Sequence, residues 1–184
     1  MKEIFHVHTY RCKHASDESD EKLIQCAISL GAKKIVFTDH VPFPENPFRN
    51  RMEIEEIGEY LETLSALKEK YQNQIEIKIG FEVEFLPKYF DFYKSLRKNP
   101  KVDILILGQH FYQCGENNFS FDKDSDFRKA NEHFGCFSAM IEGVKSGLFD
   151  CVAHPDRCFK RCKEWTSEME NLSKELINAV LEKD

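Results

Sequence analysis

The stretch VDILILGQH, residues 102–110, carries four consecutive large aliphatic residues before its polar end. An unbroken apolar run of this kind is typical of a strand buried on both faces, as the strands of parallel sheets are. Four other short apolar stretches occur along the chain. We therefore predict five strands, at residues 3–8, 33–40, 75–82, 102–110 and 149–154.

Longer amphipathic stretches separate these predicted strands. Residues 19–31 begin at a capping Ser19 and end at Gly31, with apolar residues at helical spacing between them. Further helices are predicted from Glu53, over residues 89–97 and 127–147, and from Thr166, where Ser167 and Glu170 fit a capping box. Strand–helix units that repeat without hairpins predict an α/β fold with a parallel sheet or barrel.

Length and charge limit the classes of protein to consider. We expect residues 1–184 to form one domain. The net charge of −6 argues against a general nucleic-acid-binding protein, although bound metal ions would still attract an anionic substrate. The first residues lack the apolar segment of a signal peptide, and the apolar runs are too short to cross a membrane. A cytoplasmic protein is therefore expected.

The seven cysteines are an odd number and include no Cys-x-x-Cys pair. We interpret them as reduced thiols that mostly fill the interior. Cys12 is the one to follow, because it lies between candidate ligands.

Each predicted strand carries at or near its end a residue type that binds metal ions. These residues are His6 and His8, then His40, Glu82, His110 and His154. His6 and His8 are two residues apart and therefore point to the same face of a strand. The carboxyl ends of the strands of a parallel barrel meet at one rim, where active sites lie. We expect these six side chains to converge on one metal site.

The ligand types indicate the chemistry. Imidazole and carboxylate groups suit zinc, manganese or iron, and one carboxylate can bridge two ions. A single structural zinc would need only four ligands, usually including cysteine at local spacing. The larger set favours two or three divalent ions, which polarise a phosphoryl oxygen and acidify a bound water.

Five short motifs occur in a fixed order: HVHTYRCKHA, FTDH, GFEVE, GQH and AHPDR. Together they resemble the motifs of the polymerase and histidinol phosphatase (PHP) superfamily. The opening His-x-His-Thr, Cys-x-His and Thr-Asp-His are most similar to the bacterial histidinol-phosphatase branch. The resemblance covers residues 4 to about 161. It implies a distorted seven-stranded parallel (β/α) barrel, a trinuclear metal site and phosphoester hydrolysis.

The resemblance also implies a role for each matched residue. The implied ligands are His6 and His8 for one ion, His14 and His40 for a second, and His110 and His154 for a third. Glu82 is implied to bridge the first ion to another and also to bind the third ion.

Two acidic residues near these ligands have alternative interpretations. Asp39 would either orient an imidazole or simply end its strand. Glu84 lies on the same strand face as Glu82 and competes with it as a ligand. Because Glu82 occupies the family's Gly-x-Glu position, we expect Glu84 to orient a ligand or to be exposed.

Arg157 and Arg161 follow His154 along the chain. A guanidinium at this position could bind a phosphate through two parallel hydrogen bonds. We expect both arginines to bind substrate, and Arg157 and Glu82 to be the catalytic residues. The alternative for each arginine is an ordinary surface residue.

The sequence departs from the family at its last motif. An Asp-x-His on the final strand is expected, but none follows His154. Five strand–helix units also fall short of the family's seven. We therefore expect an incomplete barrel, whose open sheet edge is a liability for a soluble protein. A fragment, a cleaved product or half of an assembly would have this form, and a homo-oligomer or a complementing C-terminal segment would supply the rest.

The expected function is metal-dependent hydrolysis of a small phosphomonoester, with L-histidinol phosphate of histidine biosynthesis as the first candidate. No nucleic-acid or membrane partner is expected. A second hypothesis is a related phosphoesterase that acts on nucleotides or DNA ends, although the acidic composition weighs against DNA. A third is a non-catalytic metal- or phosphate-binding remnant that lost its last motif.

Overall fold

The computed structural model describes residues 2–45, 48–115, 118–120, 132–160 and 162–183. The chain divides into two compact units. Unit 1 comprises Met1–Glu82 and Ser95–Leu105, and unit 2 comprises Val83–Lys94 and Ile106–Asp184. The third and fourth strands each continue from one unit into the other.

The described strands are parallel. Their bounds are β1 (Glu3–Val7), β2 (Lys34–His40), β3 (Glu76–Val83), β4 (Ile104–Leu107) and β5 (Cys151–Val152). β1 pairs with β2, β2 with β3 and β4 with β5, each in parallel, and the sheet order β1-β2-β3-β4-β5 follows the chain. The predicted α/β fold with parallel strands is therefore confirmed.

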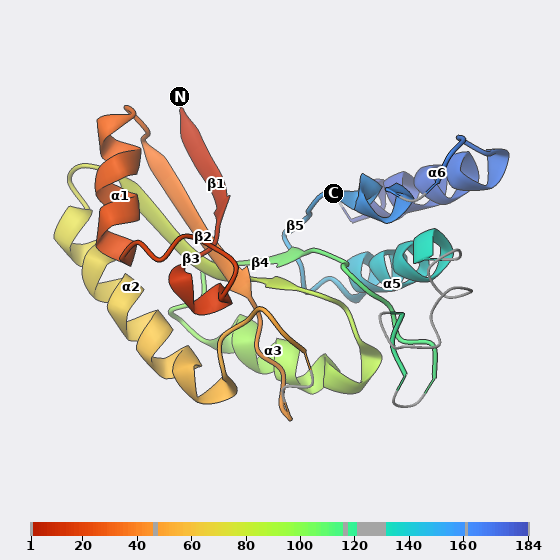
Figure 1. The fold of residues 1–184 in the computed structure, drawn as a ribbon, viewed down its shortest axis with the longest axis horizontal. Coiled ribbons are helices and arrows are strands. Elements are labelled where there is room, and N and C mark those ends of the chain that lie inside the picture. The colour runs from red at the N-terminus through yellow and green to blue at the C-terminus, as the bar shows by residue number, and fades with distance from the viewer. Residues whose placement is uncertain (1, 46–47, 116–117, 121–131, 161, 184) are drawn as a thin grey trace. The chain divides into compact units, whose positions relative to one another are not determined.

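Helices connect the strands. The described helices are α1 (Asp20–Ser29), α2 (Ile57–Tyr71), α3 (Phe90–Lys98), α5 (Glu132–Ser146) and α6 (Ser167–Leu181), and the short 3-10 helices are η1 (Tyr10–Cys12), η2 (Ile54–Glu56), η3 (Pro87–Tyr89) and η4 (Pro155–Phe159). In unit 1, α1 and α2 lie side by side (Figure 1), and Glu21 of α1 accepts hydrogen bonds from Lys70 and Tyr71 of α2. Within the described part of the chain, no helix is long and apolar enough to cross a bilayer.

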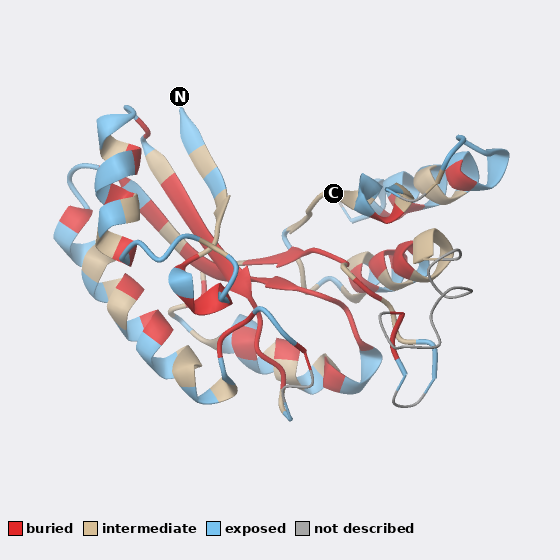
Figure 2. Ribbon diagram, in the orientation of Figure 1, coloured by how far each residue is buried: buried red, intermediate tan, exposed pale blue. Residues whose placement is uncertain are grey.

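The core of unit 1 surrounds β2. Residues 35–40 of this strand are all buried (Figure 2), as expected of a parallel strand covered on both faces. Helix α1 contributes Ile24 to this core, and α2 contributes Leu61. The carboxyl end of β2 is polar and yet buried, so Thr38 and Asp39 need hydrogen-bonding partners inside the protein.

Gly80 allows β3 and β4 to approach each other. A Cβ atom built at Gly80 would lie 1.9 Å from the carbonyl oxygen of Ile104. Any side chain at this position would therefore push the start of β4 away from β3. The hydrogen bond from the Asp103 N–H to the Ile79 carbonyl, at 2.7 Å, depends on this close contact.

In unit 2, helices α5 and α6 pack against each other, and η4 packs against α5. The ring of Phe137 from α5 lies 5.0 Å from that of Phe159 in η4, measured between centroids. Phe159 in turn contacts Trp165, also at 5.0 Å. These aromatic contacts join the short η4 to α5 and to the residues just before α6.

Several predicted element ends differ from the structure. β4 ends at Leu107, three residues before His110, and β5 covers only two residues, so that His154 follows the strand rather than ending it. The cap of α6 is Thr166, whose side chain accepts from the backbone N–H of Met169, and not the predicted Ser167. The predicted helix start at residues 127–131 lies outside the described residues.

Candidate metal centre

The first two candidate ligands meet through an irregularity in β1. The pairing of β1 with β2 shifts register between Ile4 and Val7, and His6 within this segment has a left-handed backbone with φ of 66°. β1 ends at Val7, so His8 lies just beyond the strand. The two imidazole centroids are nevertheless 4.8 Å apart. The predicted convergence is present, but simple strand alternation does not explain it.

Glu82 lies at the centre of the candidate ligands of unit 1. Its side chain is buried at the carboxyl end of β3. The Glu82 Oε1 atom is 3.5 Å from His6 Nε2, and its Oε2 atom is 3.4 Å from His8 Nε2 and 3.1 Å from His40 Nδ1. One carboxylate thus faces three imidazoles that come from two other strand ends.

His14 joins the same group from the loop after η1. Its ring centroid is 5.2 Å from that of His8 and 5.1 Å from that of His40. One potential ligand atom from each of these three histidines lies within 4.8 Å of the other two. The structure therefore brings together all five residues of unit 1 that were predicted as ligands.

The donor set of unit 1 fits a divalent transition-metal ion. Imidazole nitrogens and carboxylate oxygens bind zinc at about 2.0–2.2 Å, in a shell whose ligands are about 3.3 Å apart. The present spacings lie close to that arrangement. In addition, burial of a carboxylate such as Glu82 is unfavourable unless positive charge compensates it. A divalent cation would supply that charge.

Asp39 organises the turn beside this group. Its Oδ1 accepts a hydrogen bond from the Thr9 N–H and its Oδ2 accepts one from the Thr9 hydroxyl, both at 2.6 Å. Thr9 caps η1, the helix that leads from His8 to His14. Burial raises the pKa of Asp39 to about 6, against the opposing effect of the hydrogen bonds from Thr9. Asp39 thus holds this turn through Thr9, and a direct role in orienting an imidazole stays a prediction.

One group that orients a candidate ligand was not predicted from the sequence. Thr38, fully buried in β2, hydrogen-bonds through Oγ1 to Nδ1 of His6 at 2.8 Å. The parallel pairing of β1 and β2 was predicted. However, the register shift near His6, which brings the two side chains together, leaves no mark in the residue pattern.

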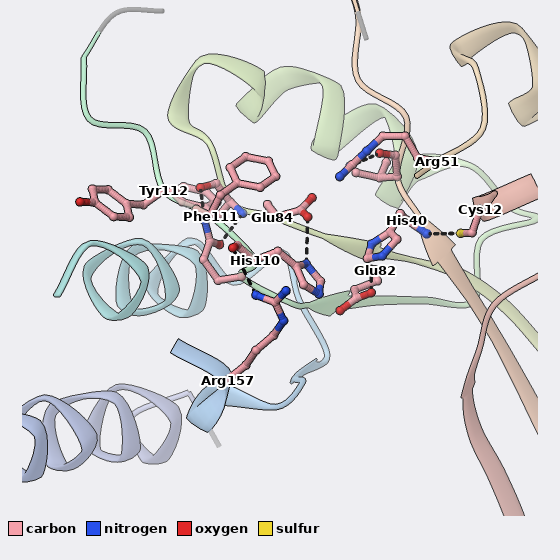
Figure 3. A network of polar contacts seen from close by, with 12 residues as sticks. Cys12, His40, Arg51, Glu82, Glu84, His110, Phe111, Tyr112 and Arg157 are labelled. Carbon is pink, nitrogen blue, oxygen red and sulfur yellow. Dashed lines mark hydrogen bonds and ion pairs between the residues drawn. The ribbon is translucent and has the colours of Figure 1, made fainter. Parts of the chain in front are cut away.

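Unit 2 holds a second group of predicted site residues. Glu84 is fully buried, and its Oε1 accepts a hydrogen bond from Nδ1 of His110 at 2.9 Å (Figure 3). The imidazole centroids of His110 and His154 are 5.1 Å apart, and His154 has a left-handed backbone with φ of 31°. Glu84 was expected either to orient a ligand or to be exposed, and the second expectation is wrong. A carboxylate at this distance holds the His110 ring in place.

Arg157 also contacts His110. Its exposed guanidinium donates a hydrogen bond through Nη1 to the His110 carbonyl oxygen at 3.3 Å (Figure 3). Among the described residues this contact occupies one N–H of the guanidinium, which leaves its other N–H donors for further hydrogen bonds. Arg161, the other predicted substrate-binding arginine, lies outside the described residues.

Comparison with known proteins places this arrangement in a family. A family model described as the PHP domain matches residues 5–184. The chain belongs to the PHP domain family. The resemblance drawn from the five sequence motifs is therefore confirmed.

Curated relatives carry a consistent description. A protein of Deinococcus radiodurans, named "Probable histidinol-phosphatase", is 29% identical over 82% of this chain and 59% of its own length. The histidinol-phosphatase of Bacillus subtilis is 25% identical over 80% of this chain and 58% of its own length. The chain thus spans somewhat less than three fifths of the length of these two relatives.

A solved structure supports the fold. The chain aligns with histidinol phosphate phosphatase from Lactococcus lactis, a structure complexed with zinc, L-histidinol and phosphate, at a TM-score of 0.75 and 19% identity. The alignment covers 99% of this chain and 70% of that one. The likeness confirms the parallel α/β fold.

Proposed function

We propose that this PHP chain is a metal-dependent phosphomonoester hydrolase whose substrate is L-histidinol phosphate. The observation that carries the proposal is the buried Glu82 carboxylate, which lies within 3.5 Å of imidazole nitrogens of His6, His8 and His40. The substrate is inferred from the two curated relatives and from the histidinol and phosphate of the aligned structure. Hydrolysis would release L-histidinol, the product expected of a step in histidine biosynthesis.

Two to three divalent ions, zinc, manganese or iron, are proposed as cofactors. The proposed ligands are His6, His8, His14, His40 and Glu82 in unit 1, and His110 and His154 in unit 2. Ions bound in this way supply Lewis-acid stabilisation of a phosphoryl oxygen and acidify water at neutral pH. The zinc of the aligned structure supports this choice of metals without fixing their number.

The protein's own groups would orient the ligands and bind the substrate. Thr38 fixes the ring of His6, and Glu84 fixes the ring of His110. The Arg157 guanidinium would bind the phosphate through two parallel hydrogen bonds, a geometry that Lys cannot provide. The same role for Arg161 remains a prediction from the sequence.

Other sequence predictions stay predictions. They are a cytoplasmic location, a single domain over residues 1–184, the absence of a nucleic-acid partner, and a second copy or a C-terminal segment that supplies the Asp-x-His motif. Each is compatible with a biosynthetic enzyme that acts on a small phosphorylated metabolite.

Phosphate release by the purified chain tests the proposal. The chain is stripped of metal, reloaded with zinc or manganese, and assayed on L-histidinol phosphate, a nucleoside monophosphate and a 3′-phosphorylated DNA end. The matched controls are metal-free protein and Glu82→Gln. A parallel assay adds a separately produced segment that carries an Asp-x-His.

We expect metal-dependent turnover that is fastest with L-histidinol phosphate and is abolished by Glu82→Gln. Faster turnover of the nucleotide or DNA substrate would replace the proposed substrate with the second hypothesis. Loss of all turnover, both with and without the added segment, would favour the non-catalytic remnant.

A further inference from the structure

Cys12 connects three of the candidate ligands. It is the last residue of η1, and its side chain is buried with no measurable exposure. Its sulfur lies 3.3 Å from Nδ1 of His8 and accepts a hydrogen bond from the backbone N–H of His40 at 3.1 Å (Figure 3 shows the contact with His40). Its carbonyl oxygen lies 2.9 Å from Nδ1 of His14. One residue therefore contacts three histidines.

The direction of these hydrogen bonds follows from the available protons. A carbonyl oxygen only accepts, so Nδ1 of His14 carries the proton that it donates to Cys12. A thiol is a weak hydrogen-bond donor, and the Cys12 sulfur already accepts one hydrogen bond, from the His40 N–H. We therefore assign the sulfur as the acceptor in its contact with Nδ1 of His8. On this assignment both imidazoles carry their proton on Nδ1.

This protonation pattern is the one that a metal ligand needs. A neutral imidazole with its proton on Nδ1 has its lone pair on Nε2. The Nε2 atom of His8 is the one that faces the Glu82 carboxylate, at 3.4 Å. In free histidine the other tautomer, with the proton on Nε2, is the commoner one. Without an acceptor at Nδ1, His8 would mostly present a proton to an incoming cation.

We infer that Cys12 is a positioning residue of the metal centre: its sulfur and carbonyl hold His8 and His14 in the tautomer that directs Nε2 to the ion. This inference rests on the proposed function, because it assigns Cys12 a role in binding the proposed metal. It differs from the interpretation of Cys12 as a simple packing residue. It also differs from a role as ligand, for which the nearby atoms of His8, Cys12 and Asp39 would be the alternative set.

Thr38 provides an internal comparison. Its hydroxyl contacts Nδ1 of His6 in the way that the Cys12 sulfur contacts Nδ1 of His8. The two acceptors come from different elements, β2 and η1, and serve different rings. Thr38→Val should therefore change His6 alone, whereas Cys12→Ala should change His8.

Nitrogen NMR of the metal-free chain tests the inference directly. Long-range 15N–1H correlation spectra report which ring nitrogen of each histidine is protonated, and single His→Gln variants assign the signals. We expect Nδ1–H for His8 and His14 in the wild type. Cys12→Ala should shift His8 toward Nε2–H. Cys12→Ser, which keeps an acceptor, should retain Nδ1–H, and Cys26→Ala, at an exposed cysteine of α1, should change nothing.

Zinc binding provides the second readout. Loss of a group that orients a ligand typically weakens metal binding by about 10–100-fold. Competition with a chromophoric chelator should show a loss in this range for Cys12→Ala, a smaller loss for Cys12→Ser and none for Cys26→Ala. Thermal unfolding of each metal-free variant shows whether it is folded. The wild-type tautomer tests the inference even if Cys12→Ala does not fold.

Three results would overturn the inference. The first is a proton on Nε2 of His8 in the wild-type protein. The second is a folded Cys12→Ala variant in which the His8 tautomer and the zinc affinity are both unchanged. The third is a thiolate-to-metal charge-transfer band in the cobalt-loaded wild type, which would make Cys12 a ligand. Failure of the proposed function would look different. In that case the wild type would show Nδ1–H at His8 but bind no metal or release no phosphate.

Discussion

The Glu82 carboxylate and the His40 imidazole face each other at the carboxyl ends of neighbouring strands, with 3.1 Å between Oε2 and Nδ1. Strands β2 and β3 pair in parallel, with His40 directly opposite Glu82. The register of two buried strands thus positions these two side chains. Rigid strands place such groups more reproducibly than loops do, which suits a site that must hold its ligands at fixed distances.

Glu82→Gln should remove more metal than any single histidine substitution. The amide keeps the size of the side chain but loses the negative charge that faces three imidazoles. The zinc affinity should fall by more than the roughly 10–100-fold that loss of an orienting group costs. Elemental analysis after dialysis against limiting zinc measures this. His14→Ala, at an exposed ligand, is the comparison, and equal metal loss in the two variants would contradict the central role of Glu82.

Arg157→Ala should lower kcat/KM for phosphomonoesters without changing the metal content. Loss of a charge-assisted hydrogen bond costs about 1.5–3 kcal/mol, or roughly 10–150-fold in kcat/KM. Steady-state phosphate release measures the effect, with Lys160→Ala as the control at a nearby exposed cation. An unchanged kcat/KM would show that Arg157 is a surface residue.

The buried ion pair between η1 and α1 should be important for stability. Arg11 donates to Asp20 at 2.8 Å, and both side chains are almost fully buried. Asp20→Ala would leave the guanidinium short of its main partner, and the free energy of unfolding should fall by about 3–5 kcal/mol. Urea denaturation measures this.

Glu59→Ala is the control. Glu59, the other carboxylate that contacts Arg11, is 65% exposed, so its loss should lower the free energy of unfolding by less than about 1 kcal/mol. Similar losses in both variants would be inconsistent with this account.

Two glycines of unit 1 should respond in opposite ways to substitution by alanine. At Gly80 the new Cβ would meet the Ile104 carbonyl oxygen, so unfolding free energy should fall by about 3 kcal/mol or more. At Gly58, in α2, a Cβ would meet no atom within 4 Å, and the gain in helix propensity should stabilise the protein by about 0.5–1 kcal/mol. Thermal unfolding of both variants checks this. A tolerated Gly80→Ala would mean that β3 and β4 are farther apart than described.

The sequence was sufficient to predict the order of the described strands and helices and the group of polar side chains that unit 1 brings together. Unbroken apolar runs such as Ile104–Leu107 mark buried strands, and polar residues that follow such runs mark the rim of a parallel sheet. The predicted positions of the strand ends were less accurate. His110 and His154 lie beyond their strands, because backbone pairing stops where the chain turns and a hydrophobicity pattern does not record this.

The groups that orient the ligands were harder to predict. The contact between Thr38 and His6 depends on a register shift and on a left-handed residue, both of which are set by pairing with β2. The sulfur contacts of Cys12 depend on the turn that Thr9 and Asp39 form together. Such contacts arise from the folded arrangement of several elements, and no single stretch of sequence encodes them.

Anomalous diffraction at the zinc absorption edge, from crystals of the zinc-loaded chain, tests the central claim most directly. We expect at least two anomalous peaks about 3.5–4 Å apart, with Glu82 and imidazole nitrogens of His6, His8, His14 or His40 about 2.0–2.2 Å from an ion. Zinc found only at cysteine thiols or surface carboxylates, with these five side chains free of metal, would contradict the account.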